Sequence, residues 1–434
     1  MVRRVYVSFA LVAAGMAILA GSAIAASNQR PVYAVVDVND PLDQRMYDYM
    51  TAAVRDDTAD VVIFQIDSPG MASGDPSELF AAIRSVDRPV LAWVGPAPAV
   101  AHGGVASILN LSDVSGAAPG AQVGYLDPAV VAGDVEPPFR SDHGGPQEAN
   151  ASRERLRSTS VEVREPVAGY VDVVTPTIGQ FIVGLDGIQI LKNGATHVLD
   201  TAAVESTDAG EVTVAAVDVR FSKPGLWDRF LRLGARPETA FFFLIAGIAV
   251  ATFEFYAAGV GVSAAVAVVA LFLAGYAMAI LPMRWWAVVV TLVGLFLYTW
   301  EFQRNQLGWR SVVGTAALIV GGVFFVDATP QFGPVPWLVL VIVAGTGLFY
   351  GVALTTIARS RFSTLTIGRE GLIGKVGTAE TDLTPDGIVS VDGARWRSRS
   401  HRAAGIVAGD AVEVLSIDGI VLEVGPTVDH DVRG

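Results

Sequence analysis

The chain has 434 residues, of which 52% are hydrophobic and 17% are charged, so part of it is expected to lie in a lipid bilayer. It contains no cysteine, which excludes disulfides, thiol nucleophiles and thiolate metal sites. The net charge of −13 argues against a protein that binds nucleic acid mainly through electrostatics. The length allows about three folded units.

Residues 1–26 have the pattern of a signal peptide. Arg3 and Arg4 precede an apolar run over residues 5–20, and small residues follow as far as Ala25 and Ala26. We expect cleavage near Ala25 or Ala26 and export of the segment that follows. An uncleaved anchor is the alternative, although the apolar run is shorter than the ~20 residues that span a bilayer.

Residues 27–210 are predicted to form an exported α/β domain. Strand-like runs alternate with amphipathic stretches, which is typical of βαβ units whose parallel sheet is covered by helices. The strand-like runs are residues 32–38, 61–66 and 90–94, and the stretches between them are residues 43–54 and 77–83. We expect residues 211–237 to link this domain to the membrane.

Residues 238–358 are predicted to be a transmembrane region of about five helices, from apolar runs at 241–253, 259–281, 285–300, 311–326 and 337–357. The surroundings of Glu254 recur around Glu301, 47 residues later, and each glutamate is followed by a glycine-bearing turn. The repeat therefore predicts a pair of helices used twice. Acids within a membrane segment suggest function, but these two lie at helix ends, and a structural role is favoured.

The charge distribution predicts the orientation of this multi-pass cell membrane protein. With an exported N-terminal domain and five spans, the C-terminal domain lies in the cytoplasm. Four arginines then face inward and Arg284 faces outward, as the excess of cytoplasmic positive charge requires. The inward arginines are Arg304, Arg310, Arg359 and Arg361.

Residues 359–427 are predicted to form a small all-β barrel of the OB type, followed by a tail at 428–434. Five short strand-like runs are separated by turn signals such as Asp392-Gly393 and Asp418-Gly419. Alternation along one strand places Arg395, Arg397 and Arg399 on one face and Trp396 on the other. Residues 359–434 contain nine Lys+Arg and eleven Asp+Glu, so a nucleic-acid groove is disfavoured. These four residues are instead candidates for partner binding or for contact with an anionic membrane surface.

No metal or cofactor site is predicted. The five histidines are scattered without ligand spacing, and no phosphate-binding loop or dinucleotide fingerprint is present.

The remaining site candidates lie at the end of the second predicted strand and after the third. Asp67-Ser68-Pro69-Gly70 closes the second strand, and His102-Gly103-Gly104 opens the helix after the third. A strand end with a free backbone N–H beside a helix N-terminus is the geometry that stabilises an oxyanion in acyl transfer. Asp67 itself is interpreted as a turn residue.

This arrangement resembles the ClpP-class, crotonase-like domain of long NfeD-family membrane proteins. Four segments carry the resemblance: residues 67–70, 94–96, 119–124 and 170–174. The C-terminal region, with Gly377, Gly387, Trp396 and Asp418-Gly419, resembles the family's barrel. The resemblance implies a membrane-anchored serine peptidase with a Ser-Lys dyad. It also implies a stomatin- or flotillin-like partner, and an exported domain that forms homo-oligomers.

The catalytic residues of the family do not carry over. The nucleophile position matches Gly103, or His102 after a shift of one residue, and neither has a hydroxyl. The family's lysine belongs to a helix in the region of residues 133–160, which here reads as a polar loop, and no lysine occurs before Lys192. The second glycine of the oxyanion loop, after Gly70, is replaced by Met71. Three nearby serines, interpreted as structural, are the other hydroxyl candidates: Ser107, Ser112 and Ser115.

Three function classes follow. The preferred one is a membrane scaffold or adaptor for a stomatin/flotillin-like partner, with a degenerate peptidase domain, because loss of both dyad members removes acyl-enzyme chemistry. The second is an active serine peptidase with relocated residues. The third is a transporter, which the repeat suggests but which lacks a midplane charge or a broken helix pair.

Overall fold

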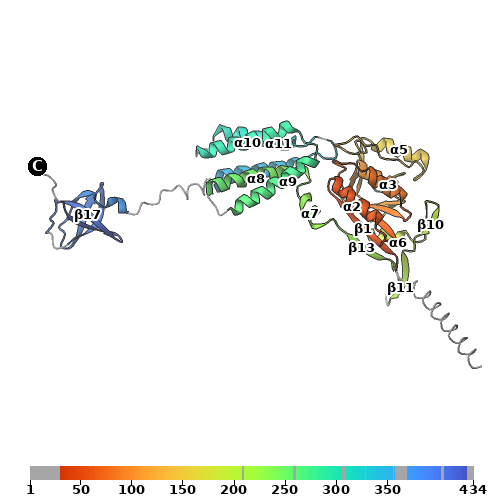
Figure 1. Ribbon diagram of the computed structural model, residues 1–434, viewed down its shortest axis with the longest axis horizontal. Coiled ribbons are helices and arrows are strands. Elements are labelled where there is room, and N and C mark those ends of the chain that lie inside the picture. The colour runs from red at the N-terminus through yellow and green to blue at the C-terminus, as the bar shows by residue number, and fades with distance from the viewer. Residues whose placement is uncertain are drawn as a thin grey trace, which may run out of the picture. The chain divides into compact units, whose positions relative to one another are not determined.

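The computed structural model describes residues 30–207, 210–257, 261–304, 308–327, 329–354, 356, 369–401 and 405–427. The expected signal peptide (1–26) and tail (428–434) lie outside these residues. The chain divides into two compact units at Leu354 and Thr355. The first unit holds an α/β domain and the membrane helices, and the second holds the barrel (Figure 1).

A six-stranded parallel sheet forms the centre of the α/β domain, in the order β13-β1-β2-β3-β5-β8. Nearly every residue of β2 and β3 is buried, as expected for a parallel sheet covered on both faces. The three strands predicted from apolar runs are confirmed. The strands are β1 (Val32–Asn39), β2 (Val61–Asp67), β3 (Val90–Val94), β5 (Val114–Ala117), β8 (Val173–Val174) and β13 (Asp218–Ser222).

Five helices accompany this sheet: α2 (Gln44–Arg55), α3 (Ser77–Ser85), α4 (Gly104–Leu111), α5 (Pro146–Leu156) and α6 (Ile178–Gly184). Helix α4 is buried at all eight positions and therefore packs in the core. Helix α5 lies in the stretch read as a polar loop from the sequence, so that interpretation was wrong. Its residues are mostly polar, and only Ala149, Ser152 and Leu156 are buried.

A second, three-stranded sheet stands beside the first and carries the candidate site. It consists of β4 (Val100–His102), β6 (Gln122–Gly124) and β7 (Ser160–Glu162). Two hairpins follow, β9–β10 (Gln189–Lys192, Ala195–Val198) and β11–β12 (Ala202–Thr207, Gly210–Ala215). Because β13 pairs with β1, the α/β domain extends past residue 210 into the stretch expected to be a linker.

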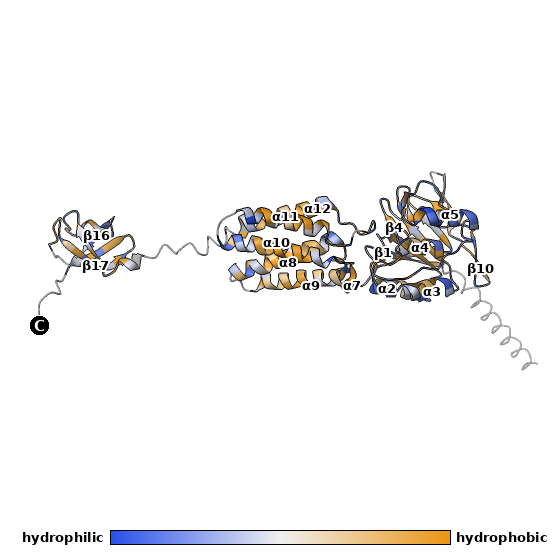
Figure 2. Cartoon of the chain, turned by 90° about the horizontal axis from the view of Figure 1, so that it is seen from above, coloured by the Kyte–Doolittle hydropathy of each residue, from blue (hydrophilic) through white to orange (hydrophobic). Residues whose placement is uncertain are grey.

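The membrane region contains three helices that are long and apolar enough to span a bilayer, and two shorter apolar ones, among the described residues. The long helices are α8 (Pro237–Ala257), α9 (Val262–Ile280) and α10 (Trp285–Gln303). The shorter ones are α11 (Trp309–Val323) and α12 (Pro336–Leu348), and α12 continues as the π-helical turn η2 (Phe349–Leu354). Of the five membrane-spanning helices expected from the sequence, three are thus supported by their length and composition. Figure 2 shows these helices as mostly hydrophobic along their length, and the short helix α7 (Leu226–Arg232) precedes them.

The predicted repeat corresponds to two helical hairpins, α8–α9 and α10–α11. Glu301 accepts hydrogen bonds from the backbone N–H groups of Gly308, Arg310 and Ser311 at 2.7–3.0 Å and from the Ser311 hydroxyl. Glu254 likewise accepts from Gly261 N at 3.1 Å and from the Ser263 hydroxyl. Each glutamate therefore caps the N-terminus of the next helix, which is the structural role favoured from the sequence.

The second unit is a closed five-stranded barrel in the order β14-β15-β16-β18-β17, as predicted. A short 3₁₀ helix, η3 (Arg369–Leu372), precedes it, and its core includes Val389, Val414 and Leu422. The strands are β14 (Val376–Ala379), β15 (Asp386–Val391), β16 (Ala394–Ser400), β17 (Ala411–Asp418) and β18 (Val421–Pro426).

Candidate site at the start of helix α4

Gly103 occupies the turn between strand β4 and helix α4, at the position that the family resemblance assigns to a serine nucleophile. Its backbone has φ 58° and ψ −136°, a conformation that is open to glycine and strained for other residues. A Cβ at this position would lie 3.1 Å from Gln331 Oε1, 3.1 Å from Pro128 O and 3.2 Å from Ala129 O. The turn is therefore shaped for a residue without a side chain.

The backbone N–H groups of this turn already have partners. Gly103 N donates to Gly124 O at 3.2 Å and to Tyr125 O at 3.0 Å, and Gly104 N donates to Ala129 O at 2.8 Å. An oxyanion site requires donors that are free to reach the developing negative charge. The turn does not present such donors.

The strand end at Gly70 and Met71 lies opposite this turn. Gly70 N donates to Ser68 Oγ at 3.3 Å, and Asp67 Oδ1 accepts from Val100 N at 3.1 Å, so Asp67 holds the turn, as interpreted from the sequence. The Met71 side chain is fully buried, and its Sδ lies 2.4 Å from where a Cβ on Gly104 would be. Met71 thus fills space that a second glycine would leave open.

Two residues from the loop between α11 and α12 fill the space between the Gly70 and Gly103 backbones, which is called the groove from here on. Gln331 Nε2 donates to Tyr125 O at 2.6 Å and to Pro128 O at 3.2 Å. Phe332 is 2% exposed, and its ring tip lies 3.4 Å from where a Cβ on Gly70 would be. Burial of a phenylalanine side chain contributes about 1.5–3 kcal/mol. This contact has no signal in the sequence, because the loop has neither periodicity nor a motif.

Neither helix α5 nor Lys192 supplies a general base to the turn at Gly103. Helix α5, in the region where the family's lysine is expected, carries Arg153 and Arg155, and a guanidinium does not deprotonate in proteins. The Lys192 ammonium contacts Asp113 Oδ2 at 2.6 Å, which also accepts from Val90 N. Val90 begins strand β3, whereas Gly70 and Gly103 lie at the carboxyl ends of the strands. Lys192 therefore lies at the opposite end of β3 from the turn, and each residue of the strand adds about 3.3 Å to their separation.

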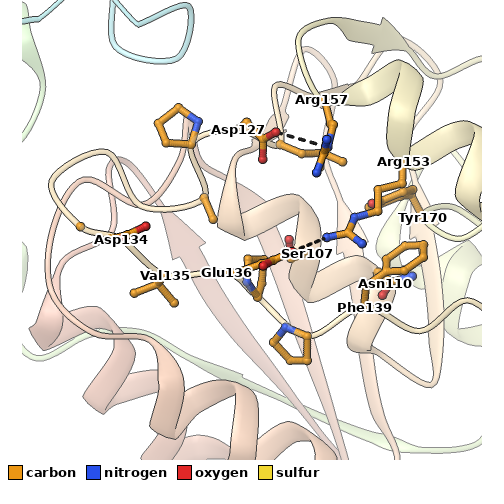
Figure 3. A pocket seen from close by; sticks show the side chains of 16 residues that line it. Ser107, Asn110, Asp127, Asp134, Val135, Glu136, Phe139, Arg153, Arg157 and Tyr170 are labelled. Atoms are coloured by element: carbon orange, nitrogen blue, oxygen red, sulfur yellow. Dashed lines mark hydrogen bonds and ion pairs between the residues drawn. The ribbon is translucent and has the colours of Figure 1, made fainter.

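The three alternative serines have structural contacts or no base beside them. Ser112 Oγ donates to Ile108 O at 2.7 Å, four residues back along its helix, and Ser115 Oγ donates to Asp172 Oδ2 at 3.0 Å. Ser107 lines a cavity of about 310 Å³ without a hydrogen-bonded base among the described residues. Figure 3 shows two arginines at the rim of this cavity, each paired with a carboxylate: Arg153 with Glu136 at 3.2 Å and Arg157 with Asp127 at 3.3 Å.

His102, the other residue matched to the nucleophile position, contacts a serine that sequence reasoning missed. His102 Nε2 lies 3.0 Å from Ser160 Oγ on strand β7. Burial lowers the pKa of His102 to about 4, so its imidazole is neutral at pH 7. The sequence separates the two residues by 58 positions, and only the pairing of β6 with β4 and β7 brings them together.

A buried network under α4 was also missed. His143 Nε2 lies 2.9 Å from Asp172 Oδ2, which accepts the Ser115 hydroxyl as well. Burial alone would lower the pKa of His143, but the hydrogen bond and negative charge of Asp172 outweigh it and raise the pKa. The carboxylate stands between serine and histidine, so the histidine cannot take the serine's proton as it does in a catalytic triad. The network is therefore structural.

On the barrel, strand β16 presents the predicted alternation. Arg395, Arg397 and Arg399 are exposed, and the Trp396 side chain is partly buried against the barrel core. Arg395 pairs with Glu380 at 2.6 Å and Arg399 pairs with Asp386 at 2.8 Å. Within the part of the barrel that the structure describes, Arg397 makes no ion pair, so its charge is available to a partner.

Comparison with known families identifies both C-terminal parts of the chain. A model of the NfeD integral membrane domain matches residues 238–356, and a model of the NfeD-like C-terminal, partner-binding domain matches residues 369–426. Residues 238–356 and 369–426 are therefore NfeD-family domains. These two matches correspond to the membrane region and the barrel predicted from the sequence.

Among the proteins to which this NfeD protein is similar are three from Pyrococcus horikoshii. The chain is 22% identical over 400 residues to the membrane-bound protease PH1510, covering 86% of this chain and 88% of the relative. It is similar to the solved 1510-N membrane protease specific for a stomatin homolog (21% identity, 46% of this chain, 97% of that chain, TM-score 0.34). It is also similar to 1510-C, the C-terminal domain of a stomatin operon partner protein (35% identity, 14% of this chain, 98% of that chain, TM-score 0.14).

The described residues of the NfeD protein contain no group of three or more His, Asp or Glu side chains that could hold a metal ion.

Proposed function

We propose that this NfeD protein is a membrane scaffold whose α/β domain has the architecture of a serine peptidase without its catalytic chemistry. The observation that carries the proposal is Gly103. It supplies no hydroxyl, and its φ of 58° together with three oxygens within 3.2 Å of a Cβ disfavours any residue that does.

Three further observations support the loss of catalysis. The N–H groups of Gly103 and Gly104 donate to backbone carbonyls, and helix α5 offers arginines in place of a lysine. Loss of the nucleophile or the base alone reduces catalysis by several orders of magnitude in serine hydrolases. The groove beside Gly70 also contains Gln331 and Phe332 in place of a substrate.

The scaffold is proposed to engage a stomatin-like protein through its barrel. The barrel matches a family model described as partner-binding, and the relatives act on a stomatin homolog or are encoded in a stomatin operon. The exposed face of β16 with Arg397 is the proposed contact. In the orientation expected from the arginine distribution, the barrel is cytoplasmic and the α/β domain is exported.

An active peptidase with relocated residues is the second candidate, favoured by one contact. Ser160 Oγ lies 3.0 Å from His102 Nε2, next to the turn at Gly103. The low pKa of His102 makes its imidazole a poor base, since general base catalysis is most efficient when the pKa of the base lies near the working pH.

Co-purification with a stomatin homologue tests the proposal. The full chain and a stomatin homologue from the same organism are expressed together in membranes, and the complex is analysed by mass spectrometry. We expect co-purification of the intact homologue. Arg397→Glu should weaken it, whereas Lys375→Glu, a charge reversal at a residue that pairs within the barrel, should not. A shortened homologue that appears only with this chain would contradict the proposal.

A further inference from the structure

We infer that the groove between Gly70 and Gly103 is a docking site for a segment of the same chain, the α11–α12 loop at residues 329–335. Docking of this loop couples the α/β domain to the membrane helices and keeps the groove closed to peptides. The inference goes beyond the scaffold function, because it says which segment of the chain occupies the groove. It holds whether or not the α/β domain has catalytic activity.

The loop enters the groove with two adjacent side chains. Gln331 is 6% exposed and Phe332 is 2% exposed, whereas Pro330 and Gly333 on either side are exposed. Gln331 Nε2 donates to the carbonyls of Tyr125 and Pro128, and the Gln331 side-chain oxygen lies between the Gly70 and Gly103 backbones. A dipeptide is thus buried, while its flanking residues stay at the surface.

The glycines of the groove provide the room for this dipeptide. A Cβ on Gly70 would lie 2.9 Å from Gln331 Oε1, and a Cβ on Gly103 would lie 3.1 Å from the same atom. Both distances are shorter than ordinary contacts of a Cβ with an oxygen. The glycine that replaces the nucleophile therefore serves the fit of the loop.

Both ends of the loop are fixed to membrane helices. Val335 N donates to Glu238 Oε1 of α8 at 2.7 Å, and Asp327, just before the loop, pairs with Arg284 at 2.6 Å. A movement of α11 and α12 relative to α8 would therefore pull on the docked dipeptide. This connection gives the membrane region a direct mechanical link to the groove.

The docked state also contains an energetic cost. Gln331 Oε1 is buried without a hydrogen-bond donor among the described residues. A buried acceptor without a donor costs free energy, and this cost offsets part of what the burial of the dipeptide contributes. The loop is thus held, but a peptide that supplies a donor could compete for the groove.

Cysteine alkylation of the full chain in detergent or nanodiscs tests the docking, since the natural chain has no cysteine. Phe332→Cys and Gly333→Cys are compared, because a Cβ on Gly333 has no neighbour nearer than 3.9 Å. We expect maleimide to react about tenfold more slowly with Phe332→Cys, since reaction requires local opening. Equal rates would overturn the inference.

A second set of variants tests whether the groove is the cause of protection. Adding Gly70→Val to Phe332→Cys should raise its alkylation rate to that of Gly333→Cys. Gly145→Val should not, although Gly145 also has a positive φ, because nothing lies within 4 Å of its Cβ position. If Gly70→Val fails to fold, Gln331→Ala replaces it, and the same rise is expected. Continued protection with the folded variant would contradict docking in this groove. Alkylation does not depend on hydrolysis, so a failed scaffold proposal would leave this result interpretable.

Discussion

At the scale of single residues, the candidate site is defined by Gly103, at the position that the family resemblance assigns to a serine nucleophile. We do not expect replacement by serine to create a nucleophile, because a side chain at Gly103 meets both a positive φ and three oxygen atoms. We expect Gly103→Ser to destabilise the full chain by about 1–3 kcal/mol and to have no peptidase activity. Thermal unfolding in detergent and a peptide cleavage assay measure both effects.

Gly145→Ser is the control for that experiment. Gly145 has φ 98° but an open Cβ position, so its serine variant carries backbone strain without crowding. It should destabilise the chain less than Gly103→Ser does. A Gly103→Ser protein that is as stable as the parent, or that cleaves peptides, would refute the interpretation of this turn.

The His143–Asp172 pair predicts a pH dependence. The pKa of His143 is raised above 6.5, so its contribution to stability is complete below pH 6.5 and is lost as the pH rises through the raised pKa. The pKa of Asp172 is lowered below 3.8, so its contribution is lost only in stronger acid. Unfolding of the full chain at pH 5 to 8 should therefore show a loss of stability that His143→Gln abolishes and His197→Gln retains. An unchanged profile in His143→Gln would contradict this.

At the scale of elements, sequence patterns predicted those strands and helices that are formed mainly by the burial of apolar side chains. The strands β1 to β3 and the long membrane helices were found because their apolar residues follow the period or length that a sheet or a bilayer requires. Helix α5 was missed because only three of its residues face the core, and β13 was missed because its side chains are mostly exposed. The contact of Gln331 with the groove depends on the complete fold, so no local pattern could indicate it.

The two glutamate caps offer a comparison between equivalent elements. Glu301 is 5% exposed and accepts four hydrogen bonds from the described residues, whereas Glu254 accepts two from them. Glu301→Gln should destabilise the membrane region by about 1–3 kcal/mol, because buried donors at the start of α11 lose a charged acceptor. Glu254→Gln should destabilise the membrane region less than Glu301→Gln does. Melting temperatures in one detergent compare them, and a larger loss for Glu254→Gln would contradict the account.

At the scale of the whole molecule, we propose that the α/β domain, the membrane region and the barrel act as parts of one scaffold. The sequence predicted an α/β domain, a membrane region and a barrel, and it suggested Gly103 and Met71 as positions that depart from the pattern of the family. It was not sufficient to find Ser160 beside His102, because strand pairing alone brings them together. That pair is the strongest argument for residual catalysis.

Covalent labelling of the intact chain tests the loss of catalysis most directly. The full-length protein in detergent is treated with a fluorophosphonate, which reacts only with activated serines, and the adducts are mapped by mass spectrometry. The account predicts no adduct on Ser160, Ser107 or any other serine. A stoichiometric adduct on Ser160 that disappears in both Ser160→Ala and His102→Gln would show an active hydrolase and contradict it.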